Sequence, residues 1–227
     1  MPRGPLAWAV VVAAGSGARF GSYKQFASLG GREVVEWSLL VARRCCAGAA
    51  LVVPPELVAL YQGRAQVVVA GAATRTGSVR AGLAAIPPQV DVVVVHDAAR
   101  PLASDATWQA VIAAVGAGAE AAVPCVPVTD TIKQRLVDGR LVTLPRGTLV
   151  AAQTPQAFRA SSLRSAHAGG LEATDDAALV EAAGGQVVEV LGDPGNLKIT
   201  APFDLAVAEA LLIRSAEAVK AGAGGSL

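Results

Sequence analysis

A glycine-rich loop carrying two cations follows the first apolar run of the sequence. Residues 10–24, VVVAAGSGARFGSYK, place three glycines beside Arg19 and Lys24. Because glycine lacks a Cβ atom, backbone N–H groups of such a loop can approach and surround an anion. Cations beside that anion suit nucleotidyl transfer, in which the α-phosphorus gains a fifth ligand and pyrophosphate departs. The loop from Ala13 to Lys24 therefore predicts a triphosphate site.

Other interpretations of this loop fit less well. A dinucleotide-binding fingerprint needs a third glycine where Phe20 stands and an acidic residue after the second strand. A Walker loop needs a final Gly-Lys-Ser or Gly-Lys-Thr. Arg19 and Lys24 could instead be solvated surface charges. However, the chain has only four lysines among 19 basic residues, so a lysine in the glycine loop indicates a use for a compact charge.

Two further loops carry charged residues directly after apolar runs. Asp97 ends the run VVVVHD, and a carboxylate there is a natural ligand for Mg²⁺, which takes one or two protein oxygens and fills its other positions with phosphate and water. Alternatively, Asp97 caps a helix or pairs with Arg100. His96 is expected to be a packed, hydrogen-bonded neighbour and not a base. Lys198, a second rare lysine, follows the last apolar run and could hold phosphates.

The loop GAATRTGSV leads from an apolar run into a helix. Backbone groups at Ala72 and Ala73 could contact a base edge, with Ser78 or Arg75 near the phosphates or ribose. Ser78 could equally be a residue that only starts the helix.

Apolar runs alternate with helical spacing along the chain, which predicts an α/β fold with a doubly wound, mainly parallel twisted sheet. The expected strands are Trp8–Ala13, Ala50–Val53, Gln66–Ala70, Val92–His96, Ala121–Val126 and Val187–Leu191. Helical spacing is seen at Val34, Trp37 and Val41, at Val79, Leu83 and Ile86, and at Trp108, Val111 and Val115. The carboxyl ends of parallel strands meet at one edge, so the loops after residues 13, 70, 95 and 191 should face one crevice.

The alternation breaks between about residues 128 and 152. Leu136 to Thr143 has the pattern of a β-hairpin that turns at Asp138 and Gly139, so we expect a β-arm that leaves the sheet. A last helix is expected at Pro202 to Val219. We therefore predict one domain over residues 1–220, including the arm, and a disordered glycine-rich tail at 221–227.

Composition narrows the class of protein. A formal net charge of +1 predicts no nucleic-acid partner, and no apolar run reaches the roughly 20 residues of a membrane helix. Three cysteines with neither disulfide nor metal-ligand spacing favour a cytoplasmic location. The run from Leu6 to Ala14 could imitate a signal peptide, but a buried first strand is the better interpretation because the glycine loop depends on it.

Taken together, these segments resemble the 2-C-methyl-D-erythritol 4-phosphate cytidylyltransferases of the non-mevalonate isoprenoid pathway, which are Rossmann-like nucleotidyltransferases. The resemblance runs from about Ala9 to Leu212. It is carried by AAGSGARF with YKQF, GAATRTGSV, VHDAARP, VPVTDTIK, QTPQAF, ATDDAALVE and GNLKIT with PFDLA. It implies a magnesium-dependent reaction of CTP with a polyol phosphate, the methylerythritol phosphate, to give the CDP-linked alcohol and pyrophosphate.

The resemblance also implies roles for individual residues. The catalytic set would be Arg19, Lys24, Lys198 and Arg146, with Asp97 on the metal. CTP would be bound by Ala13, Ala14, Gly15, Ser16, Gly17, Ala72, Ala73, Ser78 and Ala98. The acceptor would contact Arg100, Thr131, Arg146 and Thr174. Family members are homodimers that exchange their arms, so Thr131, Arg146 and Arg100 would serve the neighbouring subunit's site.

The sequence departs from the family pattern at two places. Ala72 and Ala73 replace the usual glycine and acidic residue beside the cytosine. Pro194 stands where some relatives have a second acidic neighbour of the metal, and Asp193 beside it is not expected to be a ligand. The nearest alternative function is a ribitol-5-phosphate cytidylyltransferase. A non-catalytic nucleotide-sensing module is a more remote alternative, because it would not need both cations.

Overall fold

The computed structural model describes residues 4–15, 17, 20–21 and 23–223 of the 227-residue chain. Its centre is an eight-stranded sheet with the order β10-β7-β11-β6-β1-β4-β5, and β12 pairs with β7 outside this path. The sheet strands are β1 (Ala7–Val12), β4 (Gly48–Val53), β5 (Val67–Ala70), β6 (Val92–Asp97), β7 (Ala121–Pro127), β10 (Val150–Ala152), β11 (Gln156–Arg159) and β12 (Val187–Leu191).

Most neighbouring strands of this sheet are parallel, as predicted. β1 is paired in parallel with β4 and β6, β4 with β5, and β7 with β12. Every residue of β4 and β6 is buried, which explains why these strands are continuous apolar runs without alternation. The α/β class and all six predicted strands are confirmed, with ends that differ by at most two residues.

Two antiparallel strands were not predicted. β11 lies between β6 and β7 and runs antiparallel to both, and β10 pairs with the far end of β7. β11 spells QAFR, which is too short and too polar to stand out as an apolar run. Its place between two parallel strands is a feature of the topology that local sequence does not encode.

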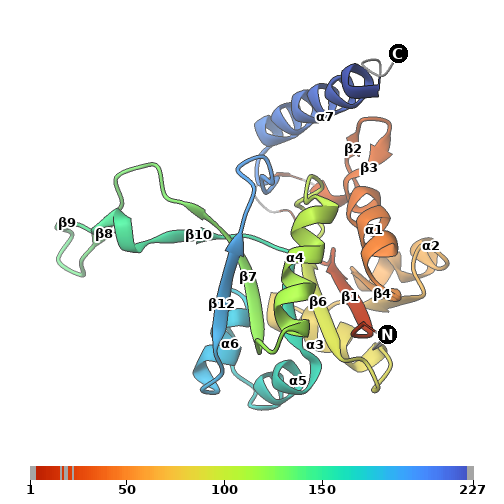
Figure 1. Cartoon of the computed structure of the whole chain (residues 1–227), viewed down its shortest axis with the longest axis horizontal. Coiled ribbons are helices and arrows are strands. Elements are labelled where there is room, and N and C mark those ends of the chain that lie inside the picture. Colours follow the sequence, from red (N-terminus) through yellow and green to blue (C-terminus); the bar gives the residue numbers. More distant parts are fainter. Residues whose placement is uncertain (1–3, 16, 18–19, 22, 224–227) are drawn as a thin grey trace.

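Helices cover both faces of the sheet (Figure 1). They are α1 (Val34–Cys45), α2 (Val58–Tyr61), α3 (Arg75–Ala85), α4 (Asp105–Gly116), α5 (Ala160–Ala168), α6 (Asp176–Ala182) and α7 (Pro202–Ala223), with short 3₁₀ turns η1 (Lys24–Phe26), η2 (Pro55–Leu57) and η3 (Arg146–Thr148). Leu39 of α1 and Trp108 of α4 share one core cluster with Val11, whereas Leu83 of α3 and Leu163 of α5 share the other with Val10. Successive residues of β1 thus point into opposite layers.

The β-arm leaves the sheet between β7 and β10 and extends away from the other elements (Figure 1). Its hairpin joins β8 (Lys133–Arg135) to β9 (Leu141–Thr143). Gly139 has a φ of +85° and its N–H donates to the carbonyl of Leu136, so the predicted turn is confirmed. Leu136 itself, predicted as the start of the hairpin, lies in the loop, and the first strand comes earlier in the chain.

Beside α1, a small hairpin of β2 (Ser28–Leu29) and β3 (Arg32–Glu33) meets α7. Leu29 and Val34 form a third buried cluster with Ala208 of α7. α7 extends to Ala223, so Ala221 to Ala223, expected in the disordered tail, are helical. The rest of that tail, residues 224–227, lies outside the described residues. Within the described residues no helix has the length and apolarity needed to cross a membrane.

A close contact between α3 and the sheet allows a test of the packing. A Cβ atom at Gly82 would lie 2.5 Å from Val10 Cγ1 and 3.1 Å from Val52 Cγ2. We expect Gly82→Ala to lower the free energy of unfolding by about 1–3 kcal/mol, because the overpacking outweighs the gain in helix propensity. Urea unfolding would measure it. Ala84→Gly, an exposed position of the same helix, is the control and should cost about 1 kcal/mol. A stabilised Gly82→Ala protein would contradict this packing.

Candidate active site

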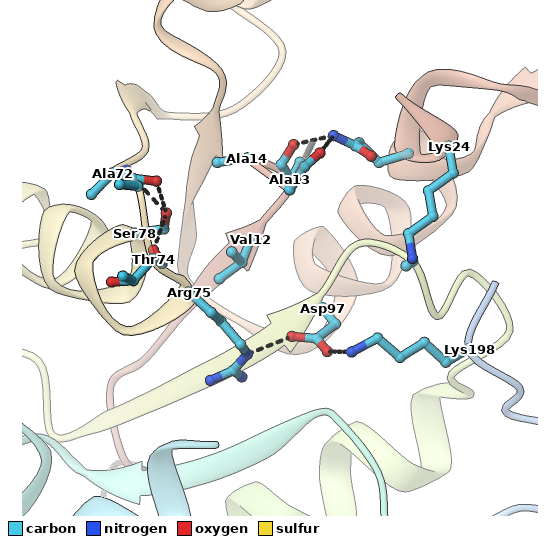
Figure 2. Close-up of a pocket in the computed structure, with 14 residues that line it drawn as sticks. Val12, Ala13, Ala14, Lys24, Ala72, Thr74, Arg75, Ser78, Asp97 and Lys198 are labelled. Atoms are coloured by element: carbon cyan, nitrogen blue, oxygen red, sulfur yellow. Dashed lines mark hydrogen bonds and ion pairs between the residues drawn. The ribbon is translucent and has the colours of Figure 1, made fainter. Parts of the chain in front are cut away.

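A cavity of about 460 Å³ opens at the carboxyl ends of the parallel strands (Figure 2). Its walls come from the loops after β1, β5, β6 and β12, the four loops that the sequence predicted to meet. The lining residues are Val12, Ala13, Ala14, Gly15, Lys24, Gln25, Ala72, Ala73, Thr74, Arg75, Ser78, Asp97, Ala99 and Lys198. Strand register explains the convergence, since Val12 lies beside Asp97 in the sheet.

The glycine loop after β1 is held by a glutamine that the sequence analysis missed. Gln25 is 3% exposed, and its Nε2 donates to the carbonyls of Ala13 at 2.6 Å and of Gly15 at 2.8 Å. These bonds fix the loop relative to η1, which carries Lys24. Figure 2 shows Lys24 reaching toward the side of the cavity where Asp97 and Lys198 lie. The signal in the sequence for this role was a glutamine directly after a rare lysine, in the segment YKQF.

The rest of the predicted phosphate loop is only partly described. Arg19 and Ser16, predicted to act in catalysis and CTP binding, lie outside the described residues. Gly17 has a φ of +65°, and its carbonyl accepts from the N–H groups of Phe20 and Gly21, which makes a tight turn.

The side chain of Ser78 hydrogen-bonds to the backbone of the loop after β5. Its hydroxyl is 3.0 Å from the Ala72 nitrogen, from which it can accept, and 2.9 Å from the Thr74 carbonyl oxygen, to which it can donate. Thr74, not Ser78, is the N-cap of α3, since its side chain accepts from the N–H of Gly77. Ser78 is 2% exposed, so it shapes the loop, whereas Ala72 and Ala73 form the exposed wall of the cavity.

Asp97 carries two ion pairs at the centre of the cavity. Arg75 Nε donates to Oδ1 at 3.1 Å, and Lys198 Nζ donates to Oδ2 at 2.5 Å (Figure 2). Burial alone would raise the pKa of Asp97, but the charges of Arg75 and Lys198 outweigh it and hold the pKa well below its usual range. The carboxylate is therefore ionised. The alternative partner, Arg100, instead donates to the carbonyls of Asn196 and Ala152.

Arg75 is the second residue that the sequence analysis underrated. Its Nη1 also donates to Asp176 Oδ2 at 2.8 Å, so the guanidinium bridges two carboxylates. Burial lowers the pKa of Arg75, but the two carboxylates raise it above the usual value, and the cation persists. Its position in the first turn of the helix after β5 was visible in the sequence, but the partners, 22 and 101 residues away, were not.

The loop that carries Lys198 is fixed from behind by a buried amide network. Gln153 Nε2 donates to the carbonyl of Asp193 at 2.8 Å, and its Oε1 accepts from the N–H of Asp193 at 3.1 Å. Asn196 Nδ2 donates to the carbonyl of Thr154 at 2.9 Å. The side chain of Asp193 accepts from the N–H of Gly195, which commits one of its oxygens to this turn.

Ala98 and Thr174 are not among the described residues that line the cavity. Ala98 is buried, and its N–H donates to the carbonyl of Val12, while its neighbour Ala99 lines the cavity. Thr174 is exposed and lies two residues before α6.

The two predicted residues of the arm lie apart from the cavity. Thr131 is exposed, and Arg146 Nη1 donates to the carbonyl of Thr129 within the arm. No described residue of the arm is among those that line the cavity of its own chain.

Two solved structures superimpose on most of the chain. The 4-diphosphocytidyl-2C-methyl-D-erythritol synthase from Anaerococcus prevotii has a TM-score of 0.80 at 29% identity and covers 92% of this chain and 99% of its own. The 2-C-methyl-D-erythritol 4-phosphate cytidylyltransferase from Thermus thermophilus has a TM-score of 0.78 at 38% identity, covering 89% and 97%. The fold and the cavity therefore define an α/β nucleotidyltransferase.

Sequence comparison identifies the family. A family model described as 2-C-methyl-D-erythritol 4-phosphate cytidylyltransferase matches residues 7–214. Proteins of that name from Frankia casuarinae and Nocardia farcinica are 45% and 44% identical to this chain, each over 92% of it and over 82% and 94% of their own lengths. The chain belongs to the 2-C-methyl-D-erythritol 4-phosphate cytidylyltransferase family, as the resemblance predicted.

His96 directly precedes Asp97 in β6, and its burial predicts how stability depends on pH. Its ring is fully buried, packs 5.0 Å from Trp108 between centroids, and lies 3.1 Å from both Thr154 Oγ1 and the Arg100 carbonyl. The expected packed, hydrogen-bonded role is confirmed. Burial lowers the pKa of His96 to about 4. Between about pH 6.5 and pH 4, His96 is therefore protonated in the unfolded chain but neutral in the folded protein. Folding becomes less favourable as the pH falls through this range.

We expect this histidine to cost up to about 3 kcal/mol of the free energy of unfolding on going from pH 7 to pH 4. Urea unfolding in EDTA at several pH values would measure it. His96→Gln, which keeps a neutral polar group, should show a correspondingly smaller loss over the same range. Parallel curves for the two proteins would exclude His96 as the source.

Proposed function

We propose that this chain condenses CTP with 2-C-methyl-D-erythritol 4-phosphate in the cavity at the carboxyl ends of the strands, giving the CDP-linked methylerythritol and pyrophosphate. The observation that carries the proposal is that Lys24 and Lys198 line the same cavity as the ionised carboxylate of Asp97, with which Lys198 forms an ion pair. An oxygen of the acceptor phosphate attacks the α-phosphorus, and the bond from that phosphorus to the β-phosphate oxygen breaks. The attacking group is already an anion, so the site needs cations more than a base.

In this proposal each cation has a distinct task. Lys24, with Arg19, neutralises the charge that develops on the triphosphate, while Lys198 holds the α-phosphate and the incoming phosphate together. The backbone of Ala13, Ala14 and Gly15 surrounds the triphosphate. The family relationship and the positions of Lys24 and Lys198 on the cavity wall support these assignments.

We further propose that Asp97 binds Mg²⁺ together with the triphosphate. The donor set fits this ion, because the carboxylate is ionised, its side chain is 12% exposed, and it lies on the cavity wall. The described residues contain no group of three or more His, Cys, Asp or Glu that could hold a metal. A single carboxylate suits Mg²⁺, which takes most of its ligands from phosphate and water. When bound, the ion would withdraw charge from the phosphate oxygens.

We propose, too, that the arm is exchanged in a cytoplasmic homodimer. Leu141 and Val142 of β9 and Val150 of β10 are 59%, 44% and 51% exposed, and such apolar side chains on a projecting arm favour a covering partner. An exchanged arm would carry Thr131 and Arg146 to the neighbouring cavity, with Arg100 and Thr174 completing the acceptor site. Free thiols at Cys45, Cys46 and Cys125 support the cytoplasmic location.

The choice of acceptor can be tested directly. Purified protein is incubated with CTP and Mg²⁺ and either 2-C-methyl-D-erythritol 4-phosphate or ribitol 5-phosphate, and pyrophosphate release is followed. We expect release with the methylerythritol phosphate and at least about tenfold less with ribitol phosphate, because the contacts to the acceptor differ in detail. Release with ribitol phosphate alone would establish the sister activity instead. Absence of release with every nucleotide and acceptor would favour a nucleotide-sensing module.

Mixed dimers test the exchange of the arm. Lys24→Ala should lower kcat far more than CTP affinity, and Arg146→Ala should raise the acceptor KM. If Arg146 acts across the dimer, half of the sites in each heterodimer are intact, so equal mixing of the two variants should restore about a quarter of wild-type activity.

Arg135→Ala is the matched control for this experiment, since Arg135 is also an exposed arginine of the arm. Mixing Arg135→Ala with Lys24→Ala should leave the activity that the Arg135→Ala subunits already have. If heterodimers verified by native mass spectrometry show no recovery for the Arg146→Ala pair, each site is built within one chain.

A further inference from the structure

His167 and Asp176 form a buried pair that does not line the cavity and has no role in the proposed reaction. Asp176 is fully buried at the start of α6, and its Oδ1 lies 2.9 Å from Nε2 of His167, which is 3% exposed in α5. The other oxygen, Oδ2, accepts from Arg75 at 2.8 Å. A buried carboxylate is costly unless its charge is compensated, so this arrangement commits Asp176 to Arg75.

Arg75 connects this pair to the cavity. Nε of its guanidinium holds Asp97 Oδ1, while Nη1 holds Asp176 Oδ2. Lys198 occupies the second oxygen of Asp97, so both oxygens of the proposed metal ligand are engaged by cations. A divalent ion that binds Asp97 must therefore compete with these two cations for the negative charge of the carboxylate.

From this geometry we propose that Asp176 is a positioning residue that, through Arg75, makes Asp97 available to the divalent cation. The inference rests on the metal site of the proposed function. Arg75 can release Asp97 without becoming an unpaired buried cation, because Asp176 keeps hold of the other side of the guanidinium. Without the charge on Asp176, Arg75 would have Asp97 as its single carboxylate partner and would compete more strongly with the metal.

His167 gives Asp176 a fixed orientation. Its ring occupies Oδ1, which leaves Oδ2 directed at Arg75. α5 and α6 pack against each other, and Thr76 Oγ1 of α3 exchanges hydrogen bonds with the backbone of Ala173 just before α6. The three helices thus hold the anchor of Arg75 at a set place relative to the cavity.

The test compares how strongly Mn²⁺ improves CTP binding. Equilibrium dialysis gives the CTP dissociation constant in excess Mn²⁺ and in EDTA, and their ratio is the metal enhancement. We expect Asp176→Asn to reduce this enhancement at least about fivefold relative to wild type, within the usual range of coupling between linked sites. Binding in EDTA serves as the internal reference for general damage, and thermal unfolding verifies that the variant is folded.

Two controls separate this role from a general effect of charge. Asp175→Asn removes the same charge one residue away, keeps the N-cap of α6, and does not touch Arg75, so the enhancement should change less than about twofold. In an Arg75→Gln background, adding Asp176→Asn should likewise change the enhancement less than about twofold, because Asp176 acts through Arg75.

The outcomes are distinct. The proposal is overturned, and the metal site left intact, if Asp176→Asn does not change the enhancement. The same conclusion follows if Asp175→Asn lowers the enhancement as much as Asp176→Asn does, or if Asp176→Asn lowers it equally in the Arg75→Gln background. A wild-type enhancement close to one would instead refute the metal site itself and the inference with it. If Asp176→Asn fails to fold, Arg75→Gln decides, since removal of the competing cation should maintain or raise the enhancement and a loss would overturn the proposal.

Discussion

The ionised carboxylate of Asp97 joins the segments that form the cavity, because it pairs with both Arg75 and Lys198. It ends the central strand β6 and is nearly buried, and a charge in that position costs several kcal/mol unless cations compensate it. Its two partners lie 22 residues before it, at the start of α3, and 101 residues after it, in the loop after β12. The segments around β5, β6 and β12 must therefore come together before both cations reach this charge, which links the formation of the site to the formation of the fold.

The same charge balance sets how the site can respond to a nucleotide. Arg75 and Lys198 are matched by Asp97 and Asp176, so the cations that the proposed function brings to phosphate are held by carboxylates. This arrangement fixes their positions in advance and limits the reorganisation that binding requires. It also means that a triphosphate must compete for them, and a divalent cation that takes over Asp97 would release them.

The sequence predicted those parts of the molecule that local pattern encodes. Runs such as VVVVHD identify strands that are buried on both faces, and Asp138 with Gly139 identifies the turn of the arm. Lys198 was recognisable because lysine is rare in this chain and stands in a loop. The sequence could not predict that β11 inserts antiparallel beside β6, because this pairing is a matter of sheet topology. Nor could it predict that Arg75 bridges to Asp176, because this contact depends on how α3 and α6 pack after the chain has folded.

The arm and Lys198 share one structural support. Gln153 directly follows β10, the last strand of the arm, and is 6% exposed. Its amide group bonds both the N–H and the carbonyl of Asp193, in the loop that leads to Lys198. Gln153 and Asn196 form a further hydrogen bond. The chain that returns from the exposed arm is thus rigid where it enters the sheet, and the position of Lys198 depends on that rigidity. A projecting arm and a fixed lysine are compatible because Gln153, at the boundary between them, is buried and bonds both backbone groups of Asp193.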